Sequence, residues 1–287
     1  MRDHFKIEGP AVISFSGGRT SGYMLWRILQ AHQWILPDDV KVIFANTGKE
    51  MPETLDFVRD CGPHWNVPIH WVEYRAKTDD GKQFAVVNYE TASRNGEPFA
   101  AVNIDRTYLP NPVARFCTVE LKVRVMHRFI KSAFGFEEWT SCIGMRADEQ
   151  RRVAKLSNAY EGNYETRFAP LARAGITVAD VCEFWGNQIF DLKLPNMNGR
   201  TMHGNCDLCF LKPAKQVYSL IREQPNRALW WIKQEQFAKS IQRDPNSKGV
   251  RFRFDRPSYT QMHEMALNQG EMFDFDEEPL QDCACTD

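Results

Sequence analysis

The sequence predicts an α/β protein: a parallel twisted sheet with helices on both faces, followed by a helical C-terminal extension. Three observations support this fold class. Short apolar runs alternate with helical patterns, as in right-handed βαβ crossovers. The first run ends in a glycine turn, and polar loops follow later runs. Because ligands gather at the carboxyl ends of parallel strands, we expect these loops to share one binding edge.

The first strand and its glycine turn lie in residues 11–21, AVISFSGGRTS. The strand stops at Ser14, and Gly17 and Gly18 let the backbone turn tightly and approach a ligand. The next helix directs its free N–H groups and its dipole at this turn, which favours an anion. The turn has neither the GxGxxG nor the Walker spacing, so an ordinary tight turn stays an alternative on these residues alone.

The next strands are expected at residues 41–45 and 69–72, separated by a helix that begins at Pro52. We expect Gly62 at the C-terminal end of that helix, where glycine is favoured. Residues 75–115 have no clean period, so we expect either an irregular stretch with a functional role or structure that the sequence pattern does not reveal.

An amphipathic helix is predicted to begin at Cys117, with Leu121, Val125 and Phe129 on one stripe. The strand that follows covers residues 138–143.

A capping-box pattern at Thr177 starts a further helix, and more helices follow from Pro213 and over residues 227–239. No linker separates two domains cleanly. We therefore predict a nucleotide-binding domain over residues 1–215 and a helical extension with a cysteine-containing tail over residues 216–287.

Composition excludes some classes of function. A net charge of -1 argues against a surface that coats polyanions. No apolar run approaches the ~20 residues that cross a bilayer, and the N-terminus has no signal-peptide core, so we expect a cytoplasmic protein without a membrane partner. Eight cysteines in a reducing compartment indicate thiols, metal ligands or catalytic groups rather than a disulfide framework.

Cys206 and Cys209 form a CxxC pair, which is compatible with zinc, iron–sulfur or redox chemistry. Its partner could be Cys117 or the tail pair Cys283 and Cys285. Zinc held by the CxxC and the tail pair is chemically sound, and thiols without a metal also stay open.

The turn at Ser16, Gly17, Gly18 and Ser21 resembles the PP-loop, SGGxDS, of the N-type ATP pyrophosphatases and the phosphoadenylyl-sulfate (PAPS) reductase family. Thr20 stands where the family usually has aspartate. This departure leaves the phosphate cradle intact and puts in doubt a carboxylate that would orient magnesium. The NTGKE segment after the second strand and the GMRADE segment after residues 138–143 are similar to family segments, in the same order.

The resemblance covers residues 11–211 and implies a PP-loop, adenine nucleotide alpha hydrolase-like fold. It implies that the nucleotide contacts Ser14, Ser16, Gly17, Gly18, Arg19, Thr20, Ser21, Asn46, Thr47, Gly48, Glu50, Gly144 and Arg146.

In the adenylyl-sulfate (APS) reductase branch, a Cys-Cys pair and a distant CxxC hold a 4Fe-4S cluster. Here Cys117 occupies the place of the pair and one ligand of four is missing, so the resemblance implies a cluster held by Cys117, Cys206 and Cys209. Family reductases also carry a catalytic cysteine on a C-terminal tail, in a Glu-Cys-Gly-Leu-His motif that is absent here. Cys283 or Cys285 could take that part, although neighbouring aspartates oppose a thiolate.

Two chemistries fit the resemblance. In the first, which we prefer, a PAPS reductase-like iron–sulfur oxidoreductase acts on the sulfonate of PAPS or APS, with a small thiol or a sulfur-donor protein as partner. In the second, a PP-loop sulfurtransferase adenylates a nucleic-acid base or a small molecule with ATP, with Mg²⁺ as an optional ion, and thiolates it with sulfur delivered from the 4Fe-4S cluster. A nucleotide- or metal-binding regulatory module is a further alternative, and each is compatible with a homo-oligomer.

Overall fold

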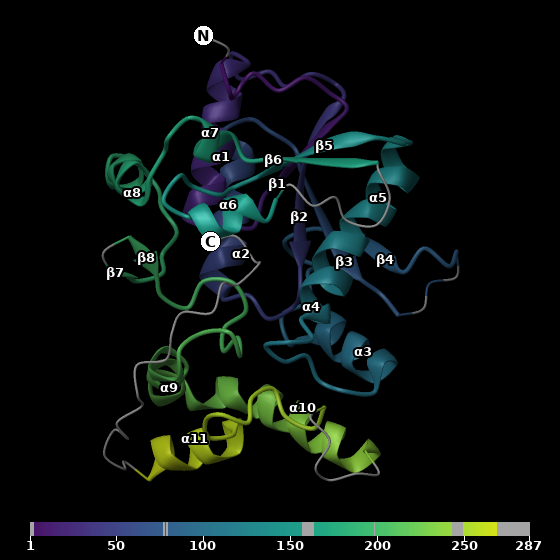
Figure 1. Ribbon diagram of the computed structural model, residues 1–287, viewed down its shortest axis with the longest axis vertical. Helices are drawn as coiled ribbons and strands as arrows, with labels where there is room; N and C mark the ends of the chain where they lie inside the picture. The colour runs from purple at the N-terminus through teal and green to yellow at the C-terminus, as the bar shows by residue number, and fades with distance from the viewer. Residues whose placement is uncertain are drawn as a thin grey trace.

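A six-stranded sheet forms the centre of the computed structural model, which describes residues 3–76, 78, 80–156, 164–197, 199–242 and 249–268. Its spatial order is β4-β3-β2-β1-β5-β6 (Figure 1). All neighbouring strands are parallel except β3 and β4, which are antiparallel. The strands are β1 (Ala11–Ser14), β2 (Val40–Asn46), β3 (Ile69–Tyr74), β4 (Phe84–Val87), β5 (Trp139–Ile143) and β6 (Glu165–Phe168).

The register brings the ends of three strands together. Ser14, the last residue of β1, pairs with Ile43 of β2 and with Ile143, the last residue of β5. The loops after β1, β2 and β5 therefore leave the sheet at one edge, which confirms that they share an edge.

Helices cover both faces of the sheet, as predicted. On one side lie α1 (Arg19–Ala31), α2 (Pro52–His64) and α8 (Val178–Gly186), which meet where the ring of Phe57 lies 5.0 Å from that of Trp185 (Figure 1). On the other side, the π-helical turn η1 (Val119–Val123) continues into α5 (Arg124–Phe134), which packs on β2, β3 and β4.

Short elements complete the part of the chain around the sheet, and a group of helices follows it. The short elements are α3 (Glu97–Arg106), α4 (Phe116–Thr118), α6 (Gln150–Ala154), α7 (Pro170–Arg173), β7 (Asn196–Met197) and β8 (Arg200–Thr201). The C-terminal group is α9 (Ala214–Glu223), η2 (Pro225–Arg227), α10 (Ala228–Ile241) and α11 (Tyr259–Leu267).

The C-terminal helices form one end of the molecule in Figure 1 and pack against α3. The fully buried ring of Trp231 lies 5.9 Å from Phe99 of α3 and 5.1 Å from Tyr259 of α11. Asn103 Nδ2 donates to Gln234 Oε1 at 2.9 Å. Aromatic packing and a hydrogen bond therefore join the predicted helical extension to the rest of the fold.

Residues 75–115 contain the edge strand β4 and the helix α3, so this stretch is structured without a readable period, whereas the expected position of Gly62 was wrong. β4 is half-exposed on both faces and gives no alternating pattern, and α3 begins after Gly96 in a left-handed conformation, without a capping side chain. Gly62 lies inside α2, which continues to His64 and ends where the N–H of Trp65 bonds the carbonyl of Cys61.

The predicted helix at Cys117 is present but composite, running through α4, the π-helical turn η1 and α5. No helix in the described ranges combines the length and the apolar composition that a bilayer span requires.

Candidate functional site

The loop between β1 and α1 is a preformed tight turn. Ser21 Oγ accepts the N–H of Ser16 at 3.2 Å and donates to the carbonyl of Gly18 at 3.0 Å. Gly17 has a φ of +79°, and a Cβ there would lie 2.7 Å from Thr54 Cγ2. Glycine is therefore required at position 17 by both backbone conformation and space.

The loop after β5 presses against this turn. A Cβ on Gly144 would lie 3.0 Å from Ser21 Cα, so the two backbones are in close contact. Arg146 Nη1 donates to Thr20 Oγ1 at 2.9 Å, and Arg146 Nε donates to Asp148 Oδ1 at 3.1 Å. The threonine that stands in place of the family aspartate is thus held by a guanidinium.

Arg19 begins α1, but its side chain is committed elsewhere. The buried guanidinium donates to Asp191 through Nε at 2.8 Å and through Nη2 at 2.7 Å. Nη1 reaches Thr201 Oγ1 at 3.1 Å, and Nη2 also reaches the carbonyl of Leu194 at 3.0 Å. The Arg19 side chain anchors the segment before β7 and the strand β8, so any contact with a ligand would come from its main chain.

The loop after β2 is folded on a buried carboxylate. Glu50 accepts hydrogen bonds from the N–H of Thr47 at 3.0 Å, from Thr47 Oγ1 at 2.9 Å and from the N–H of Lys49 at 3.2 Å. Asn46 Oδ1 accepts the N–H of Gly48 at 3.1 Å, and Gly48 has a φ of +78°. The polar side chains that the sequence assigned to the nucleotide shape this loop.

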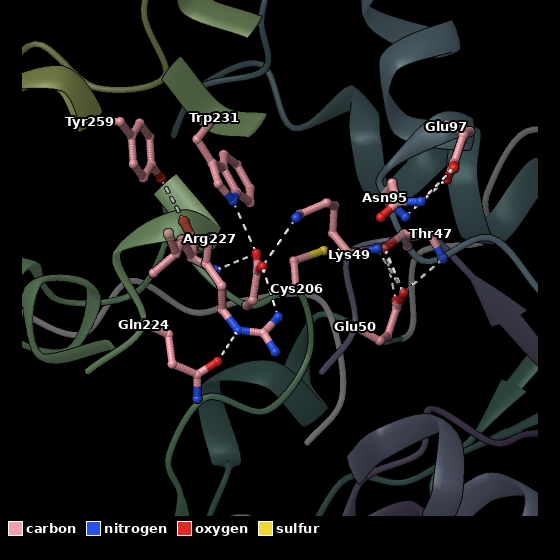
Figure 2. A network of polar contacts seen from close by, with 12 residues as sticks. Thr47, Lys49, Glu50, Asn95, Glu97, Cys206, Gln224, Arg227, Trp231 and Tyr259 are labelled. Carbon is pink, nitrogen blue, oxygen red and sulfur yellow. Dashed lines mark hydrogen bonds and ion pairs between the residues drawn. The ribbon is translucent and has the colours of Figure 1, made fainter. Parts of the chain in front are cut away.

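The same loop is attached to the CxxC turn (Figure 2). Glu50 and Cys206 form an isolated antiparallel bridge, and the N–H of Asp207 donates to the carbonyl of Lys49 at 2.7 Å. Thr47 Oγ1 lies 3.4 Å from Cys206 Sγ. Lys49 Nζ and Asp207 Oδ2 form a buried ion pair at 3.1 Å.

Asp207 carries this attachment on to the C-terminal helices. Its Oδ1 accepts the indole N–H of Trp231 at 2.9 Å and the N–H of Leu208 at 2.7 Å. Tyr259 donates its hydroxyl to the carbonyl of Leu208 at 2.6 Å (Figure 2). A buried polar network therefore links the loop after β2, the CxxC turn and α10–α11, and nothing local in the sequence indicated it.

A cavity of about 340 Å³ opens beside the glycine loop, within the size range of small-molecule sites. Ser14 and Ser16 line it, together with Ala45 at the end of β2 and the inner side of η1 and α5. Five cationic side chains also line it, namely Arg115, Lys122, Arg152, Lys155 and Arg167. Cations around a concave site favour an anionic ligand.

Only some of the residues that were predicted to contact the nucleotide line this cavity. Ser14 and Ser16 are in its lining, whereas residues 46–50 and Arg146 are not among the described residues that line it. The five cations come from segments whose periodicity shows which face is apolar but not which cavity the polar face meets. Sequence reasoning therefore missed Arg115, Lys122, Lys155 and Arg167.

Beside the cavity lies a buried acid–imidazole pair that sequence reasoning also missed. Glu165 Oε2 lies 3.3 Å from His127 Nε2, and Glu165 Oε1 accepts from Ser141 Oγ at 2.6 Å. Burial would raise the pKa of Glu165, but hydrogen bonds from His127 and Ser141 and the charges of His127 and Arg167 outweigh it and lower the pKa to about 2. Glu165 is therefore an ionised acceptor at neutral pH.

The predicted cluster ligands are only partly gathered. Cys206 and Cys209 are buried on one turn, where the N–H of Cys209 bonds the carbonyl of Cys206 at 3.3 Å, and Cys117 is half-buried in α4. Within the described ranges, no three His, Cys, Asp or Glu side chains form a group that could hold a metal ion. Cys283 and Cys285 lie outside the described residues. Both the 4Fe-4S cluster and zinc stay predictions, and no chemical step is derived through either.

Comparison with known proteins gives one family and two relatives. The family model of the phosphoadenosine phosphosulfate reductase domain matches residues 10–185, more than half of the chain. An uncharacterized nin region protein of Escherichia phage lambda is 29% identical over 212 residues, which cover 72% of this chain and 67% of the phage protein. An uncharacterized protein of Methanocaldococcus jannaschii is 28% identical over 159 residues, which cover 55% of this chain and 27% of the archaeal protein.

Proposed function

Because the chain belongs to the phosphoadenosine phosphosulfate reductase domain family, within the PP-loop superfamily, we propose that it acts on the sulfonate of an adenylyl sulfate, PAPS or APS. The match includes the glycine loop, the loop after β2 and the loop after β5. The proposal takes the nucleotide to lie with its anionic groups at Ser14–Ser21 and to extend into the adjoining cavity.

The contact between Thr20 and Arg146 carries the preference for a sulfonate. A magnesium–ATP reaction would gain from a carboxylate at position 20, since Mg²⁺ prefers oxygen ligands with negative charge. This chain has a hydroxyl there, and it accepts a hydrogen bond from a guanidinium at 2.9 Å. An arginine fork suits sulfate or phosphate oxygens.

The proposed reaction has two steps. A tail thiolate, Cys283 or Cys285, attacks the sulfonate sulfur, the S–O bond to the nucleotide breaks, and the nucleotide phosphate leaves with the electron pair. A thiol of a small molecule or donor protein then attacks the cysteine sulfur, which releases sulfite and leaves a disulfide. Loop N–H groups and Arg146 would stabilise the charge that develops on the leaving phosphate.

The alternative is the ATP-dependent sulfurtransferase, which the intact turn at Gly17 and Gly18 favours, since that turn could equally hold pyrophosphate. Its acceptor would be a nucleic-acid base or a small molecule.

The experiment supplies the full chain with PAPS, APS or ATP and a thiol donor, and measures sulfite and pyrophosphate. We expect sulfite from an adenylyl sulfate. Arg146→Met should weaken nucleotide binding about tenfold through the loss of a charge-assisted hydrogen bond, whereas Arg151→Met, at an exposed position of the same segment, should not. Pyrophosphate from ATP without sulfite from either adenylyl sulfate would overturn the proposal in favour of the sulfurtransferase.

A further inference from the structure

We propose that Glu165 recognises the base of the bound nucleotide, by accepting a hydrogen bond from the 6-amino group of adenine. This inference rests on the proposed function, because it requires a nucleotide in the cavity beside the glycine loop. It names the residue that would distinguish adenine from a 6-oxopurine.

Strand register places Glu165 at a suitable distance from the anion-binding turn. Ser14 pairs with Ile143 on β5, while Glu165 on the next strand pairs with Trp139, four residues earlier on β5. Four residues correspond to about 13 Å along a strand. The cavity includes both Ser14 and Glu165 in its lining, so it extends over the length that a base, a ribose and a 5′-phosphate need.

The partners of Glu165 leave room for one more donor. Ser141 Oγ donates to Oε1 at 2.6 Å, while Arg167 Nε at 3.2 Å and His127 Nε2 at 3.3 Å approach Oε2. An ionised carboxylate offers about four acceptor positions, so these three contacts from the described part of the chain leave one.

The surrounding contacts hold the carboxylate in place. Trp139 Nε1 donates to Ser141 Oγ at 3.1 Å, and the hydroxyl of Tyr164 lies 3.3 Å from His127 Nδ1. Since Glu165 is ionised, it can accept but not donate. It should therefore favour a base with an exocyclic amine and disfavour a carbonyl oxygen at the same position.

The cavity that contains this acceptor also has apolar lining, which suits a flat base. Val123 and Met126 come from the helical segment, and Ile143 and Met145 line the cavity towards the end of β5 that pairs with Ser14. An aromatic base pays little free energy for leaving water between such side chains, provided that its polar edge finds a hydrogen-bond partner. We assign this role to the carboxylate of Glu165.

The test compares three ligands on the full chain by calorimetric titration: ADP, IDP and N6,N6-dimethyl-ADP. ADP carries the adenine base and a 5′-anhydride of two anionic groups, as APS does. We expect ADP to bind at least about tenfold more tightly than either analogue, because each analogue lacks the donor that Glu165 accepts. Equal affinity for all three would overturn the assignment and leave nucleotide binding intact, and absence of binding by all three would overturn the proposed function itself.

A variant pair tests the residue. Glu165→Gln should reduce the preference for ADP over IDP to within about threefold, because the amide can donate to the 6-oxo group. Glu138→Gln, at an exposed position next to β5, should keep the preference of the unmodified protein. An unchanged preference in a folded Glu165→Gln protein would overturn the assignment, and should that variant fail to fold, the three-ligand comparison decides alone.

Discussion

Replacement of Gly17 by alanine tests whether the glycine loop is built as described. Gly17 has a φ of +79°, and the new methyl group would lie 2.7 Å from Thr54 Cγ2 and 2.9 Å from Val58 Cγ2. Both neighbours are buried in α2, so they have little room to move. Two costs therefore add, one from the backbone conformation and one from the overlap.

The chain offers a control that separates the two costs. Gly81 has a φ of +69°, and no described atom lies within 4 Å of a Cβ built there. Gly81→Ala should therefore lower the free energy of unfolding only through the strain of a left-handed alanine, by about 1–2 kcal/mol. Gly17→Ala should lower it by a similar amount and by about 1–3 kcal/mol more through overpacking.

Urea denaturation followed by circular dichroism measures both variants. We expect the free energy of unfolding to fall by about 1–3 kcal/mol more for Gly17→Ala than for Gly81→Ala. Only the first should also weaken nucleotide binding, because it displaces the turn. Equal losses in the two variants would show that the loop has space that the structure denies.

Three further predictions concern other parts of the molecule. Asp207→Ala should lower the free energy of unfolding, measured by urea denaturation, by about 3–5 kcal/mol, since it removes the partner of the buried Lys49. Asp80→Ala, which removes a carboxylate from an exposed ion pair, should leave that free energy almost unchanged. The pKa of Glu165 is lowered from 4.5 to about 2, so the contribution of its carboxylate to stability is complete above pH 4.5 and is lost as the pH falls towards 2. Glu165→Gln should therefore flatten the pH dependence of the unfolding free energy in that interval. An unchanged slope would contradict this prediction. Either Cys283→Ser or Cys285→Ser should abolish sulfite formation while nucleotide affinity is kept, and full turnover in both variants would remove the tail cysteines from the mechanism.

Local patterns were enough to predict the sheet and the edge at which its loops meet. The apolar run of β1 and the glycines at 17 and 18 specify a strand, a turn and a helix start within a few residues, and each such signal is independent of the rest of the fold. Repetition of the pattern at β2 and β5 then fixes where the loops meet. β4 escaped prediction because a short, half-exposed edge strand has no apolar face to repeat.

The roles of individual polar residues were harder to predict, because they depend on distant partners. Arg19 follows the glycine turn directly, yet its guanidinium bonds Asp191, far along the chain. Glu50 lies in a loop that was assigned to the nucleotide, yet its carboxylate holds Thr47. Glu165 gave no local signal, and its place beside the cavity follows only from the pairing of β6 with β5.

The proposed function requires an adenine nucleotide to bind at the glycine loop and the adjoining cavity. Calorimetric titration of the full chain with APS tests this most directly, with Gly17→Ala as the variant that distorts the loop. We predict saturable binding at one site per chain, with a clear loss of affinity in the variant. Absence of binding by APS, PAPS and ATP alike would contradict the proposed nucleotide site.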